Sequence, residues 1–273
     1  MIVVFPVFCR RLIYALPLAA LLLLAGCATR LPQRVPVDLA QEAGLRASFK
    51  EMVARQQQCH CCLDAAAQVK LDSLVFTGQL HGFVQAMSPS FVKFVAVSSL
   101  GQPVGILSSN GEEFRYVDVL ESVVYDGGVE GETYGQYVPE GFSPAFTFYW
   151  LIGRLAPGPV GITGIYRDPD DGAVWVEIRY ESNGRRSLLH YSPAEGVIRR
   201  HIVLGEDDER LLNILYDDYG PGDCPLPGRI TVTSLRMNST LEIRLSEMRN
   251  GVVLRRADFA TPAPPAFSRE VVK

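Results

Sequence analysis

The sequence predicts a mainly β protein with flanking helices. We expect a curved antiparallel sheet, an incomplete barrel, with an N-terminal helix and an apolar plug helix covering its concave face. Short runs rich in Val, Ile, Phe and Tyr recur from about Leu71 onward, and such runs are typical of strands. Asn-Gly and Asp-Gly pairs, which suit hairpin turns, lie between or beside many of them. No helical spacers of the kind that parallel strands require separate the runs, so the strands should be antiparallel.

The first residues, 1–26, are interpreted as a lipoprotein signal peptide. The basic pair Arg10 and Arg11 precedes an apolar run that ends at Ala25, which is the order found in secretory signals. The run is only about 14 residues long, short of the roughly 20 that span a bilayer, and this disfavours the alternative of an uncleaved transmembrane anchor. Its end, Leu24-Ala-Gly-Cys27, resembles a bacterial lipobox. That resemblance implies cleavage before Cys27 and a covalent lipid on its sulfur, with no other cofactor.

A tether and then a helix are expected to follow. Residues 27–37 contain two prolines and are interpreted as a lipidated tether, and the folded domain is predicted to cover residues 38–273. Asp38 can cap a helix over residues 38–58, because aspartate is a favoured N-cap residue. Leu45, Phe49, Met52 and Val53 recur at helical spacing, and we expect this stripe to pack on the sheet.

The β region is expected to form a meander. The turn pairs are Asn110-Gly111, Asp126-Gly127, Asp171-Gly172, Asn183-Gly184 and Asn250-Gly251. The predicted strands lie at 72–86, 90–98, 103–109, 112–119, 122–130, 161–167, 173–181, 185–192, 196–204, 210–217, 228–236 and 239–248.

One segment interrupts the meander and predicts the plug helix. Ser143 can serve as its N-cap and Pro144 as its first residue. Residues 145–153 are apolar on nearly every face, and such a helix has to be buried on most of its surface. The residues expected to line a cavity from this helix are Phe146, Tyr149, Trp150 and Leu151.

The composition and motifs favour a protein that is not an enzyme. Without residues 1–26 the net charge is about −6, because that segment holds two arginines and no acid; with no basic stripe, nucleic acid is an improbable partner. No nucleophile elbow, zinc-protease motif or phosphate loop occurs. The four histidines, His60, His81, His190 and His201, have no fixed partner spacing, and the acidic run 206–209 lacks the pattern of a calcium loop. We therefore predict neither a catalytic residue nor a metal.

One group of residues is compatible with several kinds of site: the cysteines Cys59, Cys61, Cys62 and Cys224. Haem attachment needs a histidine directly after Cys-x-x-Cys, and Leu63 follows Cys62 instead. A zinc site and a redox pair are alternatives, but thiolates compete poorly with disulfide formation in an oxidising compartment. We favour a structural disulfide that ties Cys224 to one member of the cluster.

Two stretches of the sequence, 94–111 and 138–157, are similar to the LolB outer-membrane lipoprotein receptors and their LolA-like relatives. The first contains a strand, a loop with Leu100-Gly101, a second strand and Asn110-Gly111; the second leads to Trp150-Leu-Ile-Gly153 and Pro157. The chain departs from the family at Ser99, where proline is usual, in its cysteine cluster and in its extra strands between Gly161 and Tyr219.

The resemblance implies a half-barrel whose apolar cavity receives acyl chains, with an exposed Leu100 that helps to release them into the membrane. The alternative is that Leu100 folds back to cap the sheet edge. The implied partners are lipidated proteins or lipids and a periplasmic carrier. Ala28 after the lipidated cysteine implies the periplasmic face of the outer membrane. We expect a monomer; the alternative function is a structural, accessory lipoprotein of envelope assembly with the same fold.

Overall fold

The computed structural model describes residues 31–73, 77–234 and 238–272. The predicted signal peptide and Cys27 lie outside the described residues. Arg34 to Lys273 form one compact unit. Each helix of the described residues is too short or too polar to span a bilayer.

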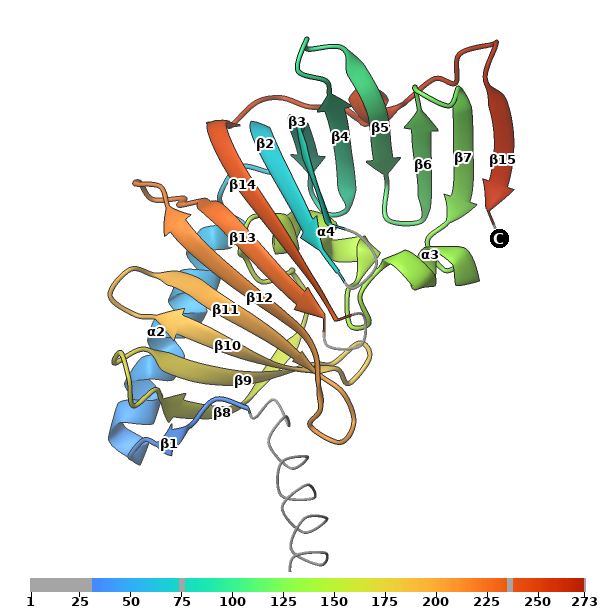
Figure 1. Cartoon of the computed structure of the whole chain (residues 1–273). Coiled ribbons are helices and arrows are strands. Elements are labelled where there is room, and N and C mark those ends of the chain that lie inside the picture. The colour runs from blue at the N-terminus through green and yellow to red at the C-terminus, as the bar shows by residue number, and fades with distance from the viewer. Residues whose placement is uncertain (1–30, 74–76, 235–237, 273) are drawn as a thin grey trace, which may run out of the picture. The chain divides into compact units, whose positions relative to one another are not determined.

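The unit is built on one large, curved and unclosed sheet, as predicted (Figure 1). Within the described residues the sheet has 15 strands in the order β1-β8-β9-β10-β11-β12-β13-β14-β2-β3-β4-β5-β6-β7-β15. Their bounds are β1 (Val35–Pro36), β2 (Cys62–Asp72), β3 (Thr77–Met87), β4 (Phe91–Val97), β5 (Pro103–Ser109), β6 (Glu113–Asp118), β7 (Val123–Gly128), β8 (Val160–Arg167), β9 (Val174–Tyr180), β10 (Arg186–Ser192), β11 (Val197–Leu204), β12 (Arg210–Tyr219), β13 (Pro227–Ser234), β14 (Ser239–Asn250) and β15 (Ser268–Val272).

Two antiparallel meanders make up this sheet. One runs from β2 to β7 and the other from β8 to β14, and the antiparallel pair β14–β2 joins them. The last strand, β15, is parallel to β7. The segment that leads to it passes behind β4 and β5 in the view of Figure 1.

The N-terminal helix α2 (Leu39–Gln57) packs on one face of the second meander, as its apolar stripe predicts. The Asp38 carboxylate accepts a hydrogen bond from the Gln41 amide at 2.8 Å, so it caps the helix as expected. Phe49 lies edge-on to Tyr191 of β10 with 5.5 Å between ring centroids, and the Ser48 hydroxyl is 2.9 Å from the Tyr191 hydroxyl. In Figure 1, α2 lies behind β9–β12. The face that it covers is the concave face.

The segment between the two meanders contains three short helices. They are α3 (Glu132–Tyr137), a 3₁₀ turn (Pro144–Phe146) and α4 (Thr147–Leu151). The predicted plug helix is therefore a 3₁₀ turn followed by little more than one turn of α-helix. Its most buried aromatic is Phe148, with Leu151 also buried, whereas Trp150 and Tyr149 are only half-buried.

Several boundaries differ from those predicted. The expected tether is shorter, because β1 already pairs with β8 at Val35 and Pro36. The strand predicted at 72–86 corresponds to β3, and the strand before it, β2, was not predicted. The sequence analysis missed β2 because its Ala65-Ala66-Ala67 run has no β-branched or aromatic residue.

Two further differences concern the first meander. Asp126 and Gly127 lie inside β7 rather than in a turn. Asp126 instead forms an ion pair with Arg115 on the neighbouring strand, at 2.5 Å. The parallel strand β15 was also missed, since so short a run carries no alternation that marks it as a strand.

Candidate functional site

The concave face of the second meander is filled. Val176, Leu189 and Ile214 are fully buried there and join α2 and α4 in one hydrophobic core. The Trp150 ring packs against the buried His201 ring with 5.2 Å between centroids. Of the plug residues, Phe146 and Trp150 border a crevice of only about 20 Å³. That volume holds about one water molecule, so these side chains fill the concavity at this crevice.

The remaining plug residues connect the two meanders. The Tyr149 hydroxyl lies 2.7 Å from the Ser88 hydroxyl, in the turn between β3 and β4. In the same turn, the Pro89 carbonyl accepts a hydrogen bond from the Phe148 amide at 3.3 Å. Leu151 belongs to the common core. The plug segment thus holds the first meander against the filled one.

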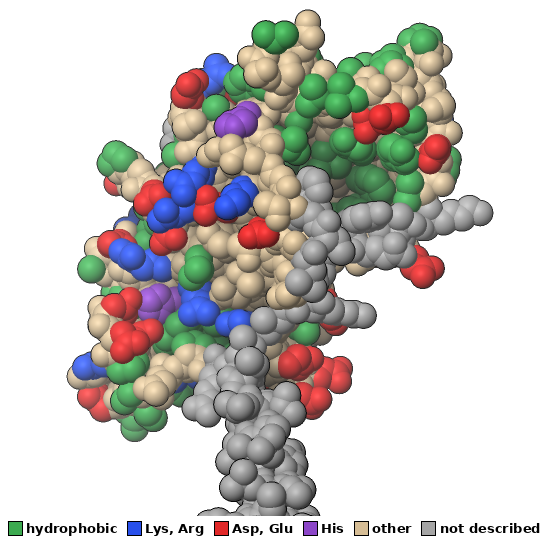
Figure 2. Space-filling model, in the orientation of Figure 1, with side chains coloured by type: hydrophobic (Ala, Val, Ile, Leu, Met, Phe, Trp, Pro, Cys, Tyr) green, Lys and Arg blue, Asp and Glu red, His purple; other side chains and the backbone are tan. Residues whose placement is uncertain are grey.

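The concave face of the first meander, in contrast, is covered only at one end, where Tyr134 of α3 packs on Phe114 and α4 contacts β4. Strand register places Val84, Phe94, Leu107, Tyr116 and Tyr125 side by side across β3 to β7, and directly opposed residues share a face of a sheet. Val84 and Phe94 contact the core, which identifies this face as the concave one. Leu107 and Tyr116 are 41% and 37% exposed. Figure 2 shows the result as a hollow of hydrophobic side chains over β4–β7.

Small residues form a second row beside the first. Ala67, Gly82, Ala96 and Gly105 are register neighbours across β2 to β5. A Cβ at Gly105 would lie 3.2 Å from the Tyr116 hydroxyl, so the tyrosine ring lies over the glycine. Because these residues carry little or no side chain, the sheet surface is low along this row and the aromatic row stands above it. We call the two rows together the open apolar face.

Leu100 lies in the loop between β4 and β5 and is 84% exposed. The Ser98 hydroxyl accepts hydrogen bonds from the amides of Leu100 and Gln102, each at 3.3 Å, and Gly101 adopts a positive φ of 78°. The loop is therefore a tight turn that presents the leucine to solvent, and the alternative in which Leu100 caps the sheet edge is wrong. Leu120, in the loop between β6 and β7, is exposed at the same end of the meander.

The outer face of the sheet differs in character. Glu177 of β9 pairs with Arg34 at 3.3 Å and with Arg186 at 3.9 Å, and Figure 2 shows charged side chains scattered over the outer face of β9–β14. The two faces thus differ in polarity, and the exposed apolar row belongs to the concave one.

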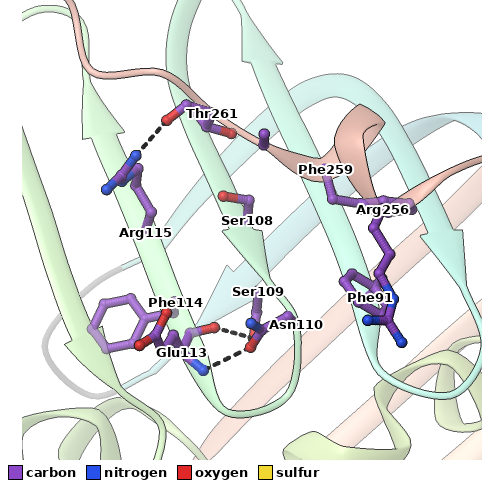
Figure 3. A pocket seen from close by; sticks show the side chains of 11 residues that line it. Phe91, Ser108, Ser109, Asn110, Glu113, Phe114, Arg115, Arg256, Phe259 and Thr261 are labelled. Carbon is purple, nitrogen blue, oxygen red and sulfur yellow. Dashed lines mark hydrogen bonds between the residues drawn. The ribbon is translucent and has the colours of Figure 1, made fainter.

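A separate pocket of about 270 Å³ lies on the outer face of β4–β6 under the C-terminal segment (Figure 3). Phe91 and Phe259 form one wall, with ring centroids 5.4 Å apart. Opposite them the Arg115 guanidinium donates to the Thr261 carbonyl at 2.7 Å. Serine hydroxyls line the floor, so the pocket combines an aromatic wall with hydrogen-bonding groups.

One serine–histidine pair has the composition of a catalytic dyad. The His201 Nε2 atom lies 3.0 Å from the Ser187 hydroxyl, but both residues are buried and Trp150 covers the histidine. Burial lowers the pKa of His201 to about 4. Among the described residues, the pair borders the crevice of about 20 Å³ behind the plug, a volume too small for a substrate.

The cysteines divide into a bonded pair and two thiols. Cys59, just after α2, is bonded to Cys224 in the loop between β12 and β13. Cys61 and Cys62 are free, with their sulfurs 3.1 Å apart. The bond ties the end of the helix to a loop 165 residues away in sequence.

The open apolar face was not identified from the sequence. Leu107 and Tyr116 belong to ordinary strand patterns, in which alternate apolar residues are expected to be buried. One signal was available in the sequence. A single plug helix of about ten residues is too short to cover a concave face a dozen strands wide, so some apolar strand residues on that face had to remain uncovered.

Comparisons with known proteins agree with this geometry. The sequence matches no protein-family model, and no curated protein matches it. Several solved structures share the fold, and three of them have TM-scores above 0.5. A DUF1329 family protein from Desulfovibrio piger has a TM-score of 0.56 and 12% identity, and the alignment covers 79% of this chain and 96% of that one.

The other two have 8% identity each. A LolA superfamily protein from Nitrosomonas europaea has a TM-score of 0.53, with 78% of this chain and 97% of that one covered. A putative outer membrane lipoprotein-sorting protein domain from Vibrio parahaemolyticus has a TM-score of 0.52, with coverages of 81% and 97%. The fold of this chain is therefore LolA-like.

Proposed function

We propose that this protein is a lipid-anchored envelope protein whose open apolar face accepts acyl chains, in the reception of lipoproteins or lipids and their insertion into a membrane. The observation that carries the proposal is the row of partly exposed apolar side chains across β4–β7, on a concave surface that α3 and α4 cover only at one end. Contiguous exposed apolar patches on soluble domains mark sites for apolar partners.

The dimensions of the face suit an extended hydrocarbon chain. Neighbouring strands lie about 4.8 Å apart, so the exposed row across the four strands β4–β7 extends roughly 14 Å. That matches a stretch of about 12 carbons of an acyl chain, taking roughly 1.25 Å per CH₂. Each buried CH₂ contributes about 0.8 kcal/mol, so even partial burial of such a chain gives substantial binding.

The position of Leu100 suits a role in passing an acyl chain from the open apolar face to the membrane. It lies at one end of the meander that bears the open face, in a rigid turn, with its side chain in solvent. We propose that it contacts the membrane when the acyl chain leaves. The lipid on Cys27 keeps the protein at the membrane, and Ala28 directs it to the periplasmic face of the outer membrane. The proposed role of the protein is that of a carrier or receptor, not of an enzyme.

Mass spectrometry of bound lipid tests the proposal. The domain lacking Cys27 is expressed in bacteria and purified without detergent from the soluble fraction of the cells. It is then analysed for lipid that co-purifies with it. We expect acyl lipid on the wild type and its loss in Leu107→Glu. Phe83→Glu is the matched control, because Phe83 is 53% exposed but lies on the outer face of β3. Absence of lipid from the wild type would favour the alternative, an accessory lipoprotein that uses the fold only for assembly.

A further inference from the structure

Three side chains that can bind metal ions meet beside the turn between β8 and β9. Asp168 and Asp171 belong to that turn, and His190 lies on β10, where its register partner on β9 is Trp175. The His190 Nε2 atom lies 3.1 Å from Asp168 Oδ2 and 3.5 Å from Asp171 Oδ1. The three ligand atoms all lie within 4.8 Å of one another.

Each carboxylate is held in place by the backbone or by a neighbouring ring. Asp168 accepts a hydrogen bond from the Trp175 indole nitrogen at 2.7 Å and another from the Asp170 amide at 2.9 Å. Asp171 accepts one from the Ala173 amide at 2.9 Å. The His190 ring packs on the Trp175 ring with centroids 4.6 Å apart. The cluster is therefore rigid before anything binds.

The Nε2 atom of His190 is buried without a hydrogen-bond partner among the described residues. The residue is only 8% exposed, and within the described part of the chain this buried nitrogen has no hydrogen-bond partner of acceptable geometry, although it faces two carboxylates. A buried polar atom without a partner loses its hydrogen bonds to water and gains none in return, which destabilises the fold. A cation between the three atoms would satisfy the imidazole nitrogen and both carboxylates together.

We propose that Asp168, Asp171 and His190 bind a divalent cation of the zinc class. With zinc–nitrogen and zinc–oxygen bonds of about 2.0–2.1 Å, ligand atoms of a tetrahedral site lie about 3.3 Å apart. The distances of 3.1 and 3.5 Å from His190 to the two carboxylates match two edges of such a tetrahedron. Asp171 is exposed, which leaves the outer side of the site open to a water molecule as fourth ligand. The site lies on the outer face, apart from the open apolar face.

Zinc titration of the full chain in detergent, after removal of metal with EDTA, tests this site. We expect calorimetry to show one Zn²⁺ bound per chain and the fluorescence of Trp175 to change with it. Asp171→Asn should weaken binding at least ~10-fold, as losses of metal-site groups do. Its amide oxygen can still accept the Ala173 hydrogen bond, so the turn is preserved.

Asp170→Asn is the matched control, because it removes the same charge from the same exposed turn but lies outside the cluster. Zn²⁺ should raise the melting temperature of the wild type and of this control, but not that of Asp171→Asn. No saturable binding to the wild type, or equal binding by the two variants, would overturn the proposal. So would binding that is lost only when Cys61 and Cys62 are alkylated.

Discussion

Replacing Phe148 by alanine should destabilise the domain strongly, although the helix that carries it is very short. Phe148 is 2% exposed and belongs to the core that joins both meanders. Truncation of a buried phenylalanine to alanine costs about 3–5 kcal/mol, from lost burial and the cavity left behind. In a domain of this size that corresponds to a fall of roughly 6–20 °C in melting temperature.

The free energy of unfolding is measured by urea denaturation at pH 7 on the domain without its lipid. Leu100→Ala is the control, because an exposed side chain away from packing usually changes stability by less than about 0.5 kcal/mol. A loss below about 1 kcal/mol for Phe148→Ala would show that the plug segment does not hold the two meanders together. Trp150→Ala should cost less than Phe148→Ala, because the tryptophan is only half-buried.

Four further outcomes are expected. Leu100→Glu should abolish lipid transfer to vesicles while the melting temperature stays within a few degrees of wild type; a strong loss of stability would place that leucine in the core. Cys224→Ser should lower the free energy of unfolding by about 2–5 kcal/mol, because the bond to Cys59 closes a long loop; a change within error would contradict this. Because the pKa of His201 is lowered to about 4 in the fold, the unfolded chain takes up a proton first as the pH falls below about 6.5. The contribution of His201 to the free energy of unfolding should therefore be fully present above pH 6.5 and fall by about 2–3 kcal/mol towards pH 4.5. Urea denaturation across this range should show that His201→Gln lacks this fall. An equal dependence of the unfolding free energy on pH in both proteins would refute it. Cys27→Ala should leave the melting temperature of the domain unchanged and release the protein from membranes in fractionation; unfolding of a soluble variant would refute the tether.

Local patterns in the sequence were sufficient to predict α2 and most of the meander. The Asp38 cap and the Phe49–Met52 stripe act within one helix, so they can be recognised without knowledge of its partner. Alternation and turn chemistry similarly mark individual strands. The pairing of β14 with β2 could not be predicted in this way, because it joins segments about 180 residues apart and depends on how both meanders curve.

The candidate sites show the same limit. Leu100 was identified because a resemblance marked its loop, and its exposure agrees with that expectation. That the plug residues line a cavity stays a prediction; their short helix fills the second meander and covers only one end of the first. Which strands remain uncovered depends on the length and path of that segment in space. His190 and Asp168 likewise meet only through the register of β9 and β10.

Site-specific photo-crosslinking in cells tests the central claim, that acyl chains bind the open apolar face. A photoreactive amino acid replaces Leu107 in one strain and Phe83 in another; the two side chains are 41% and 53% exposed, on opposite faces of the sheet. The crosslinked protein is then analysed for attached lipid or lipoprotein. The account predicts adducts at position 107 and none above background at position 83. Equal labelling at both positions, or labelling at position 83 alone, would contradict it.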